Sequence, residues 1–223
     1  MKFYLYAKFK DHEAIVKDYL SKIGEVTHSI SDCDIIVSVG GDGSLLRMGQ
    51  TAIEYDKPIV GINAGHLGYL SAFKYDQLKD LTIADFKNLK ETKRTLVEFA
   101  GELGINELCV LKENPIKSIE FEVKGIASWR GDGVIISTAT GSSSYNQAAG
   151  GPIIDPLSTD LIVTPICPHF AKEGPKVIQD DEVAIEVSER TSAIITMDNR
   201  IIGPVYGPVV VKKSKKYLRL LTK

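Results

Sequence analysis

The stretch from Asp34 to Ser44 constrains the fold of this chain more than any other. An apolar run, residues 34–39, ends abruptly in Gly40-Gly41-Asp42-Gly43, and a helix-like segment follows from Ser44 to Tyr55. The order strand, tight turn, helix presents backbone N–H groups to a phosphate, and glycine lets the backbone approach a ligand closely. An acid in such a turn is unusual, because a carboxylate repels phosphates unless it binds a cation or takes a proton.

The first ninety residues alternate strand-like and helix-like segments. Their patterns predict strands at Phe3–Ala7, Asp34–Val39 and Pro58–Asn63, and helices at 11–23, capped by Asp11, and at 44–55. This alternation indicates an α/β domain with a parallel, Rossmann-like sheet. Ligands bind such sheets at the carboxyl ends of the strands, so we expect the GGDG turn at a binding crevice.

Beyond residue 92 the pattern changes to short β-rich segments separated by turns. These are Thr95–Ala100, Ile105–Lys112, Ile116–Lys124, Gly133–Ser137, Asp160–Thr164, Glu182–Val187 and Ala193–Met197. One helical turn, Ser143–Ala149, interrupts them. We expect this part of the chain to form an all-β domain, a layered β-sandwich.

Composition and charge limit the possible partners. With 27 Lys and Arg against 29 Asp and Glu, the net charge is −2, so nothing favours a nucleic acid or an acidic membrane. Three widely spaced cysteines, Cys33, Cys109 and Cys167, form no CxxC motif and indicate a reducing, cytoplasmic setting. The histidines lack metal-ligand spacing, no apolar run reaches the ~18 residues of a membrane helix, and the first residues are too strand-like for a secretion signal.

Four further motifs follow the GGDG turn in order. They are Gly65-His66-Leu67-Gly68-Tyr69-Leu70, Asn106-Glu107, Arg130-Gly131-Asp132-Gly133 and Thr138-Ala139-Thr140-Gly141-Ser142-Ser143-Ser144-Tyr145-Asn146-Gln147-Ala148-Ala149-Gly150-Gly151. In order and spacing, from about Val37 to Pro168, the chain resembles the NAD kinase family. The resemblance implies an α/β domain at 1–92, a β-rich NAD-binding domain at 93–205, and a segment, 206–223, that returns to the first domain.

In the reaction that the resemblance implies, a phosphoryl group moves from ATP, another nucleoside triphosphate or polyphosphate to the 2′-hydroxyl of the adenosine ribose of NAD, making NADP. Such a transfer needs positioning, charge neutralisation and a group beside the attacking hydroxyl. Asp42 is the candidate base, and Gly41 and Gly43 would leave room for phosphate; the plainer alternative is a helix-capping Asp. Arg47, one helical turn further on, could reach a phosphate or simply be solvated.

Asn106 and Glu107 lie within the apolar segment Leu103–Leu111. Because adjacent strand residues point to opposite faces, one of the pair is expected to be buried or to face a cleft. An amide and a carboxylate can together read the hydrogen-bonding groups of adenine or ribose. The plainer alternative is a polar pair at a strand edge, and the resemblance favours contact with the dinucleotide.

The Arg130–Gly133 motif precedes the expected strand at 133–137. Asp132 is a candidate contact for a ribose or the nicotinamide amide, and Arg130 for a phosphate, although Gly-Asp-Gly often marks only a turn. The resemblance places Asp132 in the dinucleotide site and leaves open whether it comes from a neighbouring subunit.

The segment Thr140–Asn146 is a hydroxyl-rich entry to a short helix, where free N–H groups suit a polar or anionic ligand. The alternative is a cluster of N-capping serines. Tyr69 could lie against the nucleotide or only pack, and Arg200, in a hairpin turn at 198–200, could contact a ligand. The remaining candidate contacts are Thr140, Ser143, Ser144, Tyr145, Asn146 and Ala148.

We therefore interpret the chain as an NAD-phosphorylating enzyme that uses ATP or polyphosphate. Mg²⁺ or another divalent cation would bridge the donor phosphates, with no metal site built by the chain itself. The resemblance implies a homodimer or homotetramer. Two alternatives stay open: a lipid kinase of the diacylglycerol or sphingosine type with a related GGDG turn, and a non-catalytic NAD-binding sensor.

Overall fold

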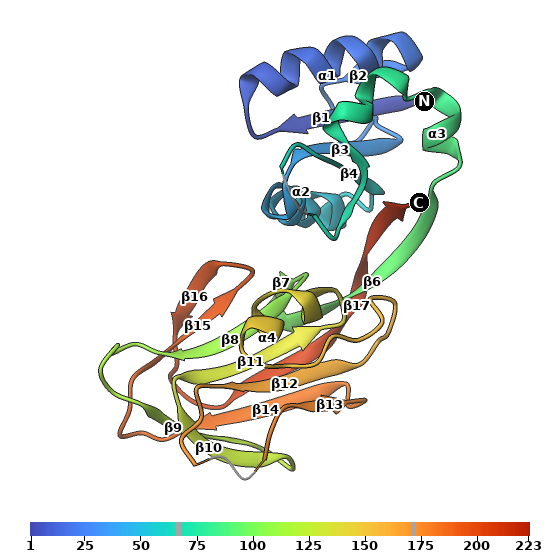
Figure 1. Cartoon of the computed structure of the whole chain (residues 1–223). Coiled ribbons are helices and arrows are strands. Elements are labelled where there is room, and N and C mark those ends of the chain that lie inside the picture. The colour runs from blue at the N-terminus through green and yellow to red at the C-terminus, as the bar shows by residue number, and fades with distance from the viewer. Residues whose placement is uncertain (66–67, 171–172) are drawn as a thin grey trace. The chain divides into compact units, whose positions relative to one another are not determined.

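The computed structural model describes residues 1–65, 68–170 and 173–223 and divides into two compact units (Figure 1). The first unit holds Met1–Lys93 together with Tyr217–Lys223, and the second holds Arg94–Lys216. Two strands, β6 (Lys90–Phe99) and β17 (Val209–Thr222), cross from one unit to the other.

The first unit is built on a parallel sheet. Its strands lie in the order β2-β1-β3-β4-β5, and every neighbouring pair is parallel. The end of β17 joins this sheet, where Leu220 pairs with Ile59 of β4. The bounds are β1 (Lys2–Ala7), α1 (Lys10–Ile23), β2 (Glu25–Thr27), β3 (Ile35–Gly40), α2 (Asp42–Glu54), β4 (Ile59–Asn63), β5 (Ser71–Lys74), the 3₁₀ helix η1 (Tyr75–Asp80) and α3 (Ile83–Lys87). The predicted Rossmann-like α/β architecture is confirmed.

Burial explains why β3 lies in the middle of this sheet. All six of its residues are buried, as expected for a parallel strand with helices over both faces. Val37 and Val39 share a core cluster with Val16 of α1. On the other face, a Cβ added to Gly61 of β4 would lie 2.8 Å from Leu45 of α2, so glycine lets that helix pack closely.

The helix starts differ from those predicted. Asp11 does not cap α1, because Phe9 occupies the N-cap position and Asp11 lies in the first helical turn. Helix α2 begins at Asp42 rather than Ser44, with Gly41 as its N-cap. Four elements of this unit were not predicted: β2, β5, η1 and α3.

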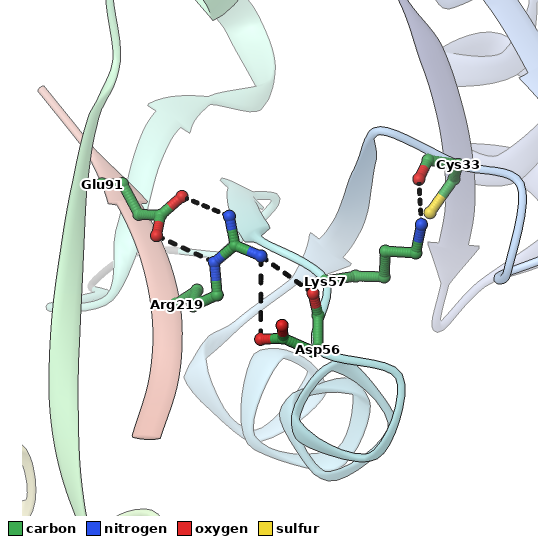
Figure 2. A network of polar contacts seen from close by, with 5 residues as sticks. All are labelled: Cys33, Asp56, Lys57, Glu91 and Arg219. Atoms are coloured by element: carbon green, nitrogen blue, oxygen red, sulfur yellow. Dashed lines mark hydrogen bonds and ion pairs between the residues drawn. The ribbon is translucent and has the colours of Figure 1, made fainter. Parts of the chain in front are cut away.

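A polar network fixes the end of β17 within the first unit (Figure 2). Arg219 donates two hydrogen bonds of 2.8 Å to the carboxylate of Glu91 and one of 2.9 Å to the backbone oxygen of Asp56. Next to Asp56, Lys57 donates to the backbone oxygen of Cys33 at 2.8 Å. These contacts join residues far apart in the sequence, and the predicted return of the C-terminal segment to the first domain is confirmed.

The second unit consists of two antiparallel layers. One sheet has the order β13-β12-β11-β8-β15-β16, and the other has β10-β9-β14-β17, with β6 beside β17 and β7 beside β6. The bounds are β7 (Glu102–Gly104), β8 (Glu107–Lys112), β9 (Ile119–Val123), β10 (Ala127–Gly131), β11 (Gly133–Thr138), the 3₁₀ helix η2 (Thr140–Ser143), α4 (Tyr145–Ala148), β12 (Leu161–Ile166), β13 (Lys176–Ile178), β14 (Glu182–Val187), β15 (Ala193–Met197) and β16 (Arg200–Pro204).

Alternation along the strands separates the two faces of the first sheet. Leu108 and Val110 of β8 belong to a large core cluster that also contains Phe121 and Val123 of β9, so the two sheets pack face to face. Cys109, between Leu108 and Val110, points the other way and forms a small cluster with Ile135 and Ile166, against which Ala149 packs. The predicted β-sandwich is confirmed, and its outer face carries η2 and α4.

Two predictions in this unit need correction. The strand predicted from Ile105 begins at Glu107, and β7 ends at Gly104, so Asn106 lies in a break between strands. The predicted helical turn at Ser143–Ala149 corresponds to the shorter α4, and the 3₁₀ helix η2, which was not predicted, lies directly before it. Strands β7, β10, β13 and β16 were not predicted.

Candidate active site

The GGDG turn borders a cavity of about 400 Å³ in the first unit. Strand register explains its position, because Ala7 pairs with Val39 and Gly40 pairs with Asn63. The carboxyl ends of β1, β3 and β4 therefore lie side by side. The lining residues are Tyr6, Lys8, Phe9, Gly40, Gly41, Gly43, Ser44, Arg47, Ala64 and Gly65.

The glycines of the turn serve two purposes. Gly40 has φ +150°, and a Cβ there would lie 2.3 Å from the hydroxyl of Ser44, so the close packing of the turn requires glycine. A Cβ at Gly41 or Gly43 would meet nothing within 4 Å, which leaves open space where α2 begins. The free N–H groups of a helix N-terminus favour an anion at that place.

Among the described residues that line this cavity, two are cations and none is an acid. Lys8 and Arg47 are both exposed, so their charges are available to an anionic ligand. Arg47 was predicted as a phosphate contact, and Lys8 was not. Lys8 is far from the turn in sequence but follows β1, and its backbone N–H donates to the oxygen of Val39 at 3.2 Å. Its place after a neighbouring strand of the sheet was the signal that could have revealed it.

Asp42 connects the GGDG turn to the loop that precedes β5. Its carboxylate accepts hydrogen bonds from the backbone N–H groups of Tyr69, at 2.9 Å, and Leu70, at 3.3 Å. A Cβ added to Gly68 would lie 3.0 Å from the same carboxylate. Asp42 is thus not the N-cap, and two of its roughly four lone-pair sites remain for another partner.

The loop before β5 also presents an aromatic side chain. The Tyr69 ring is 66% exposed, so it is accessible to a ligand. His66 and Leu67 of the same motif lie outside the described residues.

Asn106 and Glu107 are buried in the second unit, with 7% and 5% of their surface exposed. The amide nitrogen of Asn106 lies 3.5 Å from the hydroxyl of Ser144. Glu107 pairs with Ser137 across the sheet, and its Oε2 has no hydrogen-bond partner among the described residues. Burial raises the pKa of Glu107 to about 8, and the negative charge of Asp198 adds to the shift.

The Thr138–Gly151 segment packs directly on the Asn106 break. Thr138 donates its hydroxyl hydrogen to the oxygen of Ile105 at 2.7 Å and accepts the N–H of Gly141 at 3.1 Å. A Cβ at Gly141 would lie 2.2 Å from the backbone oxygen of Asn106. Glycine therefore allows this segment to place its hydroxyl groups beside Asn106.

Members of this segment differ in their exposure. Ser144, Tyr145 and Ala148 are exposed, and Ser143 is half-buried. Thr140 is buried, and its hydroxyl has no hydrogen-bond partner among the described residues. Burial raises the pKa of Tyr145, and the neighbouring groups of Cys109, Cys167, Asp132 and Glu107 raise it further.

Asn146, which was predicted as a ligand contact, lies in the interior of the second unit. It is fully buried, and its amide donates to the oxygens of Ser142, at 3.0 Å, and Pro152, at 2.9 Å. Its amide oxygen accepts the hydroxyl of Thr164 at 2.6 Å. The protein itself thus uses the hydrogen bonds of Asn146, which hold the segment in place.

The three remaining candidates lie in separate places. Asp132 forms an ion pair of 2.7 Å with Lys112 and lies close enough to Tyr145 to affect its pKa. Arg130 donates to the hydroxyl of Ser118 at 2.8 Å and lines a second cavity of about 800 Å³. Arg200 forms an ion pair of 3.2 Å with Glu102.

The described part of the chain contains neither a metal-binding cluster nor a membrane-spanning helix. Among those residues, no group of three or more His, Cys, Asp or Glu side chains is arranged to hold a metal ion. Within the same residues, none of the helices combines the length and apolarity needed to cross a membrane.

Both units match models of known domains. The ATP-NAD kinase N-terminal domain matches residues 8–93, and the ATP-NAD kinase C-terminal domain matches residues 105–221. The chain belongs to the NAD kinase family. The resemblance carried by the five sequence motifs is therefore confirmed.

Individual relatives and solved structures agree. The NAD kinase of Chlorobium phaeobacteroides (strain DSM 266 / SMG 266 / 2430) is 34% identical over 230 residues, which cover 95% of this chain and 79% of the relative. The NAD kinase of Methanopyrus kandleri is 32% identical, covering 85% of this chain and 73% of the relative. An Archaeoglobus fulgidus NAD kinase, solved with ATP, superimposes with a TM-score of 0.80 at 25% identity, covering 100% and 94% of the two chains. Yeast NADH kinase, solved with NADH, shares the fold, with a TM-score of 0.81 at 17% identity and coverage of 100% and 83%. Neither the lipid kinase nor the sensor alternative finds support among these relatives.

Proposed function

We propose that this chain transfers the γ-phosphoryl group of ATP to the 2′-hydroxyl of the adenosine ribose of NAD and so makes NADP. It is a phosphotransferase of the NAD kinase family, with both family domains present. The observation that carries the assignment is the cavity beside the GGDG turn, whose described lining contains Lys8 and Arg47 and no acidic residue. Positioning and charge neutralisation are the main requirements of phosphoryl transfer, and this cavity supplies groups for both.

Asp42 is the residue that we assign as the base. Its carboxylate is held by two N–H groups from the 68–70 loop, so its direction is fixed before substrate binds. A fixed carboxylate beside the donor phosphates can take the proton of the attacking hydroxyl. Gly41, Gly43, Arg47 and Lys8 would hold the donor.

The residues that we propose as contacts of the dinucleotide are Tyr69, Asn106, Glu107, Asp132, Thr140, Ser143, Ser144, Tyr145 and Ala148, with Arg130 as a phosphate contact and Arg200 as a further ligand contact. In this assignment the α/β domain spans 1–92 with 206–223, and the NAD-binding domain spans 93–205. Exposed hydroxyl and aromatic groups at Ser144 and Tyr145 support it.

A divalent cation, Mg²⁺ for preference, is proposed to arrive with the donor. Mg²⁺ is commonly held by one or two carboxylates together with substrate phosphates, and the half-buried Asp42 is a carboxylate next to the cavity. When bound, the cation would neutralise charge on the transferring phosphoryl group. Inorganic polyphosphate is proposed as a second donor, because none of the groups at the GGDG turn requires a nucleobase.

We further propose that the chain forms a homodimer or homotetramer and works in the cytoplasm. Cys33, Cys109 and Cys167 are all free thiols, which fits a reducing compartment. Light scattering of the purified protein tests the assembly, and a monomer at micromolar concentration contradicts it.

The decisive assay incubates the protein with NAD, Mg²⁺ and either ATP or polyphosphate, and detects NADP with an NADP-specific coupled enzyme. We expect NADP with ATP, and none from an NAD analogue that lacks the adenosine 2′-hydroxyl. Sites built to hydrogen-bond a substrate group strongly reject analogues without it. Diacylglycerol and sphingosine serve as acceptor controls, and phosphorylation of either at a rate comparable with NAD would overturn the assignment.

A further inference from the structure

One carboxylate organises the break between β7 and β8. Asp198, in the turn between β15 and β16, accepts the backbone N–H groups of Ile105, at 2.7 Å, Asn106, at 2.8 Å, and Glu107, at 3.3 Å. Three consecutive N–H groups are normally paired within a strand, and here they converge on a single side chain. Asp198 therefore replaces a strand partner and fixes the backbone from which Asn106 and Glu107 project.

Glu107 lies close to this carboxylate and has no cation to balance its own charge. It is 5% exposed, its Oε2 has no hydrogen-bond partner in the described part of the chain, and none of the ion pairs found there includes it. A buried carboxyl group without a cationic partner keeps its proton rather than ionise. The charge of Asp198 acts in the same direction.

We propose that Asp198 is a positioning residue of the dinucleotide site, which fixes Asn106 and Glu107 and keeps Glu107 a neutral acid that donates a hydrogen bond to the dinucleotide. The inference rests on the proposed function, because it takes Glu107 as a contact of NAD. A neutral donor suits a ligand that carries two phosphates, since an ionised carboxylate would repel them. Burial raises the pKa of Asp198, and the three N–H groups oppose this rise by stabilising its charged form.

Several other titratable groups lie near Glu107 and Asp198, and their pKa values are also shifted. Arg200 acts on Asp198, whose pKa burial raises and the three N–H groups lower. Burial strongly raises the pKa of Cys109, which lies on the same strand as Glu107, and the pKa of Tyr145 on α4 is also raised. Asp132 and Cys167 act on Tyr145.

The first test measures NAD binding by calorimetry between pH 6 and pH 10. If only the protonated form of Glu107 donates, the apparent Kd of the wild type rises about tenfold between pH 7 and pH 9, because about a tenth of the carboxyl stays protonated one unit above a pKa of about 8. Glu107→Gln keeps a neutral donor and loses this dependence while binding NAD within a few-fold of the wild type. A wild-type Kd that is flat across this range, or Glu107→Gln binding more than tenfold weaker at pH 7, overturns the proposal.

The second test concerns Asp198. Asp198→Asn removes the negative charge that raises the pKa of Glu107, so the rise in Kd shifts to lower pH. It also removes one acceptor oxygen for the three N–H groups, so KM for NAD increases by a larger factor than kcat falls. Asp180→Asn, an exposed acid of the same unit, and Cys167→Ser, which removes the exposed thiol, serve as controls that keep the wild-type profile. An unshifted profile in Asp198→Asn contradicts the positioning role.

A direct titration keeps the inference testable if Asp198→Asn fails to fold or the wild type makes no NADP. Carbon-13 resonances of the Glu side chains, with Glu107 assigned from Glu107→Gln, report its ionisation in the ligand-free wild type. A midpoint near pH 8 supports the neutral acid, and one near 4.5 overturns it. Absence of NADP formation with a midpoint near 8 would refute the proposed function and leave the protonation result intact.

Discussion

The two units build their candidate sites in opposite ways. In the first unit, residues 40–47 supply half of the lining of the cavity beside the GGDG turn, so one short motif describes half of that site. In the second unit, Asn106 meets Ser144 across 38 residues and Asp198 across 92. The first is a contiguous site, which depends on local backbone geometry. The second is an assembled site, which depends on the packing of the whole sandwich. Substitutions in the two sites should therefore have different effects on activity, ligand binding and stability.

The largest expected effect belongs to the contiguous site. Asp42→Asn should lower kcat for NADP formation by about 10²–10⁴, the usual contribution of a positioned base, while NAD affinity stays within a few-fold. Steady-state kinetics and calorimetry check this, with Asp80→Asn, an exposed acid of the same unit, as the control. Retention of more than about a tenth of kcat would remove Asp42 from the role of base.

Lys8→Ala should weaken the binding of the donor, ATP, and leave the binding of the acceptor, NAD, unchanged. Loss of a hydrogen bond between a charged side chain and phosphate costs about 1.5–3 kcal/mol, so KM for ATP should rise about 10- to 150-fold. Lys10→Ala removes an exposed charge two residues away, outside the cavity lining, and should change little. Equal losses in the two variants would mean that general electrostatic attraction, not the cavity, recruits ATP.

Asn106→Ala tests the assembled site. A lost hydrogen bond to a neutral ligand group costs about 0.5–1.5 kcal/mol, so Kd for NAD should rise about 2- to 13-fold with little change in melting temperature. Asp132→Ala should act in the same direction, and Asn114→Ala, in an exposed turn of the same unit, should leave Kd unchanged. A large fall in melting temperature with unchanged NAD affinity would assign these residues a structural role.

The smallest expected effect is on the free energy of unfolding, and it comes from ion pairs in the two halves of β17. Arg219→Ala should lower the free energy of unfolding by about 1 kcal/mol, since its bonds to Glu91 and Asp56 are partly screened by solvent. Lys212→Ala breaks an exposed pair with Glu182 and should cost less than about 0.5 kcal/mol. Urea unfolding measures both, and the reverse order would refute the view that Arg219 fixes the strand end.

Sequence patterns predicted the parts of the fold that local chemistry determines. The all-buried β3, the glycine turn and α2 follow from residues adjacent in sequence, and the 198–200 hairpin turn is present, with Asp198 and Asn199 at φ +45° and +63°. Asn106 was placed inside a strand because its apolar neighbours continue the pattern. Only Asp198, ninety-two residues later, reveals that the strand is interrupted there.

Of the candidate site, too, the sequence predicted mainly the residues that belong to local motifs. Asp42, Gly41, Gly43 and Arg47 all lie at or beside the first cavity, and Asn106 and Ser144 do meet. Lys8 was missed because no local motif surrounds it. The full burial of Asn146 could not be foreseen, because it depends on Thr164 and Pro152, which come from other parts of the sandwich.

The path of β17 has a consequence for how the chain is made. During synthesis, residues 1–93 leave the ribosome long before Tyr217–Lys223, which belong to the same unit. Ile59 at the start of β4 and the carboxylate of Glu91 therefore wait for partners until Leu220 and Arg219 emerge. The nascent first unit must stay incomplete while the β-sandwich is translated, so a pause near residue 216 would leave the start of β4 without this partner and the unit open to aggregation.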